Sequence, residues 1–237
     1  MVILAHRGFS AKFPENTLKA FQKGFECGAD GLELDLRMTA DKKIVVIHDE
    51  DMERLFGDRV KVCELTLSEL KKYQQDGEPI PTFEEVLSII PGGKLLNAEF
   101  KEHELAEDAI ELIGRYSLLE NTIVSSFHHD LVAKLIKKYP QIKFGFLIGE
   151  ELREDPIELV KSLLEHKPYS MHLPLNLADY PKYFKTICRM IKKENVKIFI
   201  WTLDDLQKYE SIKDSIDGVI TNDVCVFVKH IKKDKLS

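Results

Sequence analysis

The sequence predicts a TIM (β/α)8 barrel, an α/β fold, built as one domain of residues 1–237. Short apolar runs alternate with amphipathic segments of helical period along almost the whole chain. Most of these runs are apolar throughout, as in parallel strands that are covered by helices. There are nine such runs, and one of them is predicted to pair antiparallel with the run before it. The other eight supply the strands that such a barrel needs. A doubly wound open sheet is the alternative arrangement of the same units.

The strand candidates begin close to the first residue and continue almost to the end of the chain. Two of them are separated only by the letters MTADKK, which are too few for a crossover helix. We therefore predict an antiparallel ribbon there, with a two-residue turn at Asp41 and Lys42. The nine runs are Val2–Ala5, Gly31–Arg37, Ile44–His48, Lys94–Phe100, Thr122–Ser126, Ile142–Ile148, Tyr169–Leu173, Val196–Thr202 and Gly218–Thr221.

Apolar residues at helical spacing mark the segments between the strands. Leu18, Phe21 and Phe25 share one helix face. Thr82 and Glu85 form a capping box at the start of PTFEEVLSII. Similar patterns occur in ELAEDAIELIGRY, HHDLVAKLIKKY, DPIELVKSLLEH, YFKTICRMIKKE and VCVFVKHIKK. Residues 50–80 are polar and irregular, with one helix-like piece, so we predict a short insertion after the ribbon of the second strand rather than a second domain.

Composition limits the partners and the compartment of the protein. A net charge of −6 and a pI of about 5.8 disfavour nucleic acid and stable association with an anionic membrane, so a phosphate would have to be bound by a few placed cations. No run approaches the roughly 20 apolar residues of a membrane span, and the first run is too short for a signal peptide. The four cysteines lie far apart without a CxxC motif, which predicts free thiols in a reducing compartment, the cytoplasm. No segment marks an interface, so the oligomeric state is not predicted.

Acidic side chains occur at the ends of predicted strands, where TIM barrels carry their functional groups. Glu33 and Asp35 are two residues apart and leave the same face of a strand, roughly 7 Å apart along it. Glu99 and Lys101 share a face in the same way. Carboxylates that face a barrel interior repel one another and resist ionisation unless a cation neutralises them. Three carboxylates without clustered Cys or His predict one hard divalent ion, Mg²⁺ or Ca²⁺, held by Glu33, Asp35 and Glu99.

Two histidines are predicted to lie beside this cluster. His6 ends the first run, and a two-residue turn in the ribbon places His48 opposite Asp35, on the same face. A three-residue turn would direct His48 away. Paired imidazoles suit general acid and base catalysis near neutral pH, and Arg7 and Lys101 supply cations for a phosphate. The combination indicates hydrolysis of a phosphate ester.

The motifs that carry these residues, taken in order, also resemble a known family. They are HRG, PENT, ELDLRMTADKKIVVIHD, IPTFEEVL, NAEFK, VSSF, WTL and DGVITND. Over nearly the whole chain they resemble the glycerophosphodiester phosphodiesterases, TIM barrels of the same superfamily as the phosphatidylinositol-specific phospholipases C. The resemblance implies hydrolysis of glycerophosphodiesters, such as glycerophosphocholine or glycerophosphoethanolamine, to sn-glycerol 3-phosphate and an alcohol, with Mg²⁺ or Ca²⁺. It also implies attack by the neighbouring glycerol hydroxyl, followed by opening of the cyclic phosphate by water.

The resemblance assigns roles to individual residues. Asn16, from its sequence alone, is a candidate helix N-cap after Pro14. By motif, the metal ligands are Glu33, Asp35 and Glu99; the acid–base pair is His6 and His48; the phosphate contacts are Arg7 and Lys101; the aromatic wall beside glycerol is Trp201; and Glu15 and Asn16 lie at the rim.

The chain departs from the family pattern in two places. RLFGDRVKV replaces a threonine-rich run after His48, and Asn222 follows Thr221 where an aspartate is common. Two alternatives to the leading interpretation remain. One is a lysophospholipase D acting on lysophospholipids, for which the polar insertion offers little apolar surface. The other is a binding module without catalysis, which the retained histidines and carboxylates disfavour.

Overall fold

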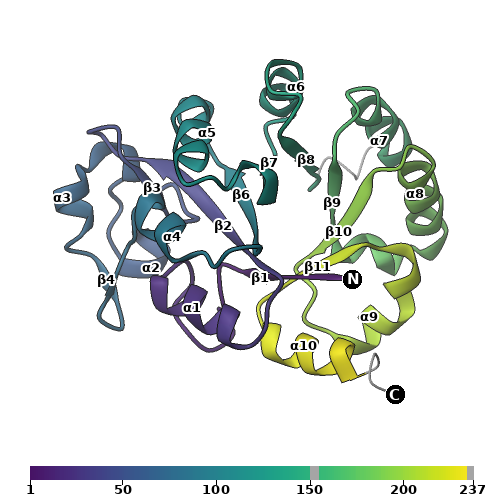
Figure 1. Cartoon of the computed structure of the whole chain (residues 1–237), viewed down its shortest axis with the longest axis horizontal. Coiled ribbons are helices and arrows are strands. Elements are labelled where there is room, and N and C mark those ends of the chain that lie inside the picture. The colour runs from purple at the N-terminus through teal and green to yellow at the C-terminus, as the bar shows by residue number, and fades with distance from the viewer. Residues whose placement is uncertain (150–154, 234–237) are drawn as a thin grey trace.

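The computed structural model describes residues 1–149 and 155–233. Within them, eight parallel strands pair in a closed ring, because β1 (Val2–His6) bonds both to β2 (Gly31–Met38) and to β11 (Gly218–Thr221). Helices cover the outside of this ring (Figure 1). The closed ring confirms the predicted TIM barrel and excludes the open sheet. The other barrel strands are β6 (Leu95–Phe100), β7 (Thr122–Ser126), β8 (Lys143–Leu147), β9 (Ser170–Pro174) and β10 (Lys197–Trp201).

The helices occupy the segments in which the sequence predicts them. The capping box of α4 is confirmed, since Thr82 accepts from the backbone N–H of Glu85. The N-cap prediction for Asn16 is wrong: Thr17 caps α1, and Asn16 has a φ of 58° outside the helix. None of the helices described combines the length and the apolar character that crossing a bilayer requires. The helices between and after the strands are α1 (Leu18–Glu26), α4 (Phe83–Ile89), α5 (Ala106–Arg115), α6 (His129–Lys138), α7 (Pro156–Leu164), α8 (Pro181–Lys193), α9 (Leu206–Ile212) and α10 (Val224–Lys233).

The interior of the barrel is divided into an apolar part and a polar part. Leu4, Ile123, Phe199 and Ile220, from four different strands, form one apolar cluster. The opposite faces of the strands pack against the helices in the main core, as Leu34 of β2 does. Inward-facing positions at the carboxyl ends of the strands instead carry charged groups. The alternation of side chains along a strand therefore separates the packing residues from those of a site at one end of the barrel.

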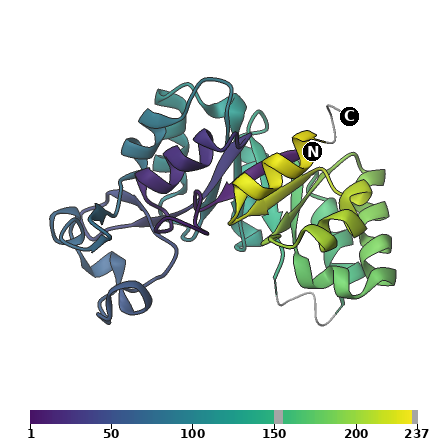
Figure 2. The ribbon, with the colours of Figure 1, turned by 90° about the horizontal axis from the view of Figure 1, so that it is seen from below.

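Residues 50–80 form a compact insertion that projects from one side of the barrel (Figure 2). Its elements are short: α2 (Glu53–Phe56), a 3₁₀ turn at Val62–Glu64, α3 (Leu67–Leu70) and a hairpin of β4 (Gln74–Gln75) and β5 (Glu78–Pro79). They share a small core with β3 (Ile44–Val46), so the insertion is tied to the ribbon that precedes it. This core consists of Val45, Ile47, Met52, Val62, Leu70 and Ile80.

The β2–β3 ribbon has a different register from the predicted one. Leu36 pairs with Val46, and the same register continues past the strand ends to Thr39 and Lys43, so the loop between the last paired residues has three residues, 40–42, rather than two. Lys42 ends this loop with a φ of 60°, as in the common three-residue hairpin loop. In a continuous strand, this register would direct His48 away from Asp35. However, β3 ends at Val46, so the orientation of His48 is set by the loop that follows the strand.

A disulfide joins Cys27, directly after α1, to Cys225 of α10, with Cα atoms 4.9 Å apart. The prediction of free thiols is therefore wrong for this pair, whereas Cys63 and Cys188 are free. The two half-cystines are 198 residues apart in sequence. They meet because α1 and α10 follow the adjacent strands β1 and β11, where the ring closes (Figure 1). Sequence spacing alone does not reveal that contact.

Candidate active site

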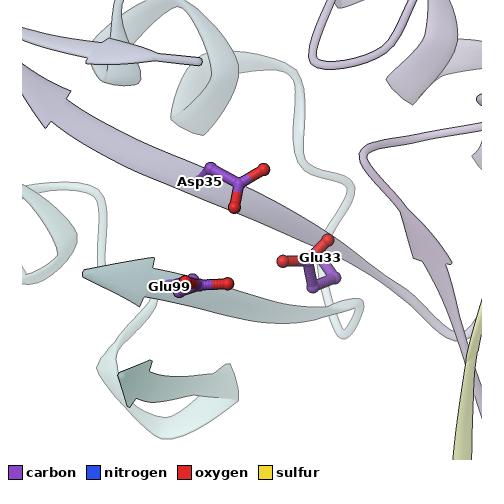
Figure 3. A group of neighbouring side chains, drawn as sticks. All are labelled: Glu33, Asp35 and Glu99. Carbon is purple, nitrogen blue, oxygen red and sulfur yellow. The ribbon is translucent and has the colours of Figure 1, made fainter. Parts of the chain in front are cut away.

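Three carboxylates meet inside the barrel at the carboxyl ends of β2 and β6. Glu33 and Asp35 leave the same face of β2, and the strand register places Asp35 beside Glu99 of β6 (Figure 3). One oxygen from each residue lies within 4.8 Å of the others, and all three side chains are buried. This set of oxygen donors can hold a hard divalent cation.

Two cations partly neutralise the cluster. Arg7 places Nε 3.1 Å from Asp35 Oδ2, and Lys101 places Nζ 3.0 Å from Asp35 Oδ1 while also bonding to Glu99. Burial and the nearby charge of Asp35 raise the pKa of Glu33, and likewise that of Glu99, to about 8. Burial also opposes ionisation of Asp35, but Lys101, Arg7 and the other contacts outweigh it and hold the pKa of that carboxyl below its ordinary value. Among the described residues, Arg7 and Lys101 are thus the lysine and arginine side chains that contact this cluster of three carboxyl groups.

His6 lies at the end of β1 with its ring between two partners. Its Nδ1 is 2.7 Å from Oδ1 of Asn222, and its Nε2 is 3.8 Å from Glu33 Oε2. Burial, and secondarily the charge of Arg7, lower its pKa. A lowered pKa favours the neutral imidazole, and one ring nitrogen faces the carboxylates.

His48 lines the same cavity as His6, although the register from which we predicted this position is wrong. The side chain of Arg37 donates from Nε to the carbonyl oxygen of His48 at 2.9 Å and anchors the backbone there. Asp49 Oδ1 lies 2.7 Å from His48 Nδ1, so this ring nitrogen is the donor. Burial lowers the pKa of His48, and Lys101 and Arg7 add to that effect.

Glu15 and Asn16 of the PENT motif contact the charged groups of the site. Asn16 donates from Nδ2 to Asp35 Oδ2 at 2.9 Å. Glu15 accepts from Nη1 of Arg7 at 3.0 Å and from Nη2 of Arg54 at 2.6 Å. Arg54, on α2 of the insertion, also donates to the carboxylate of Asp49, which contacts His48. We did not single out Arg54 from the sequence, because its partners converge only when the insertion folds back onto the barrel.

Apolar side chains form one wall of the cavity, which has a volume of about 80 Å³. Trp201 ends β10 and donates from Nε1 to the carbonyl oxygen of His172. Phe127 packs edge-on against Trp201, with ring centres 5.6 Å apart, and Leu147 lies beside them. Phe127 and Leu147 were not predicted from the sequence as lining residues.

Asn97 also lines the cavity and was missed as a site residue. It is 1% exposed, and no described residue hydrogen-bonds to either polar atom of its side chain. It pairs in register with Glu33 and precedes Glu99 by two residues, so it occupies the remaining position beside the three carboxylates. That spacing was a usable signal, because alternate residues of a strand share a face.

Comparison with known proteins assigns the chain to a family. The sequence model of the "Glycerophosphoryl diester phosphodiesterase family" matches residues 6–226. The chain belongs to this family. A "Glycerophosphodiester phosphodiesterase" of Caldanaerobacter subterraneus is 36% identical, with 98% of each chain covered. The crystal structure of a glycerophosphodiester phosphodiesterase from Thermotoga maritima matches with a TM-score of 0.86 and 42% identity, covering 97% of each chain. A human "Lysophospholipase D" is 26% identical over 92% of this chain and 82% of its own length.

Membership of the glycerophosphoryl diester phosphodiesterase family makes this chain an enzyme, a phosphoric diester hydrolase. It also confirms the resemblance seen in the ordered sequence motifs. The binding-module alternative is thereby set aside.

Proposed function

We propose that this protein hydrolyses glycerophosphodiesters such as glycerophosphocholine or glycerophosphoethanolamine to sn-glycerol 3-phosphate and an alcohol. The observation that carries the proposal is a small cavity lined by two histidines, two cations and two buried carboxylates, Glu33 and Glu99, with the carboxylate of Asp35 next to them. We further propose that Glu33, Asp35 and Glu99 hold one divalent cation, Mg²⁺ or Ca²⁺. The Caldanaerobacter relative is named a glycerophosphodiester phosphodiesterase, and the similarity of this chain to it supports the reaction class.

The residues fit a hard cation for chemical reasons. All three donors are carboxylate oxygens, and burial with mutual repulsion raises the pKa of two of them, a penalty that a bound cation relieves. Asn97 adds an amide oxygen without a partner among the described residues at the same level of the barrel, and we include it in the candidate binding set. When bound, such a cation supplies Lewis-acid polarisation and charge neutralisation at the phosphate.

The side chains of the protein provide binding and proton transfer. Arg7 and Lys101 have N–H donors beyond those that contact the carboxylates, and these can bind phosphate oxygens. One imidazole withdraws the proton of the attacking glycerol hydroxyl as the new P–O bond forms. The other protonates the departing alcohol as its P–O bond breaks, and the roles reverse when water opens the cyclic phosphate. Trp201 and Phe127 form an apolar surface beside the glycerol carbons.

A panel of glycerophosphodiesters with coupled detection of sn-glycerol 3-phosphate tests this proposal. We expect release to stop in a chelator and to return with Mg²⁺ or Ca²⁺. Full turnover by the metal-free protein would refute the metal requirement. Lysophosphatidylcholine belongs in the panel because a human relative is named a lysophospholipase D. Faster cleavage of that lipid than of glycerophosphocholine would favour the alternative activity.

A further inference from the structure

A chain of hydrogen bonds connects His6 to Asn222 and Asp204, which follow the strands β11 and β10. The proposed reaction does not use these bonds. Asn222, directly after β11, places Oδ1 2.7 Å from His6 Nδ1. Its Nδ2 lies 2.7 Å from Oδ2 of Asp204, in the loop between β10 and α9. The other oxygen of Asp204 accepts from the hydroxyl of Thr221 and from the backbone N–H of Asn222, each at 2.8 Å.

These contacts determine how the amide of Asn222 is oriented. An ionised carboxylate only accepts hydrogen bonds, so the atom of Asn222 that faces Asp204 must be the NH₂ group. The amide oxygen then faces His6 and can only accept. The neutral imidazole must therefore carry its proton on Nδ1, which leaves a lone pair on Nε2. The Ser10 hydroxyl, 2.8 Å from the same amide oxygen, is compatible with that orientation because it can donate.

We propose that Asp204 and Asn222 are positioning residues that hold His6 as the Nδ1–H tautomer, with the Nε2 lone pair directed toward the carboxylate cluster. The inference rests on the proposed function, because it supplies the reason why His6 can accept a proton at Nε2. Nε2 is the nitrogen nearer the cluster, 3.8 Å from Glu33. A proton on Nε2 instead would leave His6 unable to act as a base at that atom.

Asp204 and Asn222 are complementary in charge and in hydrogen bonding. An aspartate at position 222 would place its carboxylate 2.7 Å from that of Asp204, where the two charges repel. The amide at position 222 is therefore the group that can accept from His6 and donate to Asp204 at once. His48 is held differently, since its Nδ1 partner is the carboxylate of Asp49. This gives a chemical reason for the asparagine at which the chain departs from the family pattern.

Nitrogen NMR of the full chain labelled with ¹⁵N-histidine reads the tautomer directly, because protonated and bare ring nitrogens have separate shifts. In the neutral form, assigned by its loss in His6→Ala, we expect a proton on Nδ1 of His6. Asn222→Ala should give a mixture of tautomers. A wild-type signal with the proton on Nε2 would overturn the proposal whether or not the protein is active.

Kinetics with a residue exchange give the second test. Asn222→Asp should lower kcat by about 10- to 100-fold with KM changed by less than about threefold, because a partner that orients a histidine is lost. Adding Asp204→Asn restores a donor–acceptor pair with the polarity exchanged, and kcat should return to within about threefold of wild type. Asp205→Asn in the same loop is the control, since asparagine also caps α9.

The outcomes separate the two proposals. A double variant no better than Asn222→Asp alone, in a folded protein, would overturn the positioning role. Wild-type turnover by His6→Ala would instead overturn the role of His6 in the proposed function, while the NMR result would still decide the tautomer.

Discussion

Replacing Glu33 by Gln should stabilise the metal-free protein at alkaline pH and remove its stabilisation by metal. Glutamine keeps the shape of the side chain and an oxygen that can accept from the backbone N–H of Arg7, which lies 3.1 Å from Glu33 Oε2. It removes only the charge. The folded-state pKa of Glu33 is raised from 4.5 to about 8, so the folded protein binds this proton more tightly than the unfolded chain does. The corresponding stability is fully present below pH 4.5 and is lost as the pH rises through 8.

The size of this change in stability follows from the shift in the pKa of Glu33. At 1.36 kcal/mol per pH unit, a pKa moved from 4.5 to about 8 corresponds to about 5 kcal/mol for a charge held rigidly in place. Water and side chains relax around a buried charge, which reduces the cost, and we expect about 1–3 kcal/mol. For a chain of this size, the melting temperature of Glu33→Gln should therefore exceed that of the wild type by about 2–12 °C at high pH.

Thermal unfolding in a chelator, followed by circular dichroism between about pH 5 and about pH 8.5, measures this difference. The gap between variant and wild type should widen with pH, and added Mg²⁺ should raise the melting temperature of the wild type but not that of the variant. Glu111→Gln on the exposed side of α5 is the control, with an expected change within about 0.5 kcal/mol. A variant that is less stable than the wild type at the alkaline end, or equally stabilised by Mg²⁺, would contradict this account of the cluster.

Three further substitutions test separate parts of the site. His48→Ala should lower kcat by about 10²-fold or more, as expected for a proton-transfer group; an unchanged rate would assign that role elsewhere. Asn97→Leu, of similar volume, should weaken Mn²⁺ binding measured by electron paramagnetic resonance about tenfold, and unchanged affinity would remove Asn97 from the binding set. Arg54→Met should lower kcat about tenfold through loss of its contact to Asp49, whereas Arg59→Met, an exposed change in the same insertion, should leave kcat unaltered.

The fold and the carboxylate cluster could be predicted because both follow from short-range periodicity. Apolar runs with helices between them specify parallel strands, and two-residue spacing places Glu33 and Asp35 on one face. Glu99 adds the third carboxylate because β6 pairs directly with β2, which is the usual arrangement of successive strands in a barrel. These inferences need no knowledge of loop geometry.

The features that the sequence did not reveal depend on loops and on ring closure. The position of His48 was predicted from a two-residue turn that does not exist, and His48 nevertheless lines the cavity because β3 ends two residues before it. The Cys27–Cys225 disulfide and the contact of Asn222 with His6 both join the first and last units of the barrel. Periodicity is local, so it carries no information on pairs this far apart in sequence.

The closure of the ring and the insertion together explain why the two histidines are held by different parts of the chain. His6 stands at the end of β1, and the ring places β11 next to it, so its partner comes from the last strand of the barrel. His48 follows β3, which lies outside the ring at the edge of the sheet, next to β2. Its partner Asp49 is instead fixed by Arg54 of the insertion, which also pairs with Glu15. The insertion thus provides for one histidine the support that the closed sheet provides for the other. A shortened insertion that kept the barrel intact should therefore disturb the contact of His48 with Asp49 and leave the hydrogen bond between His6 and Asn222 in place.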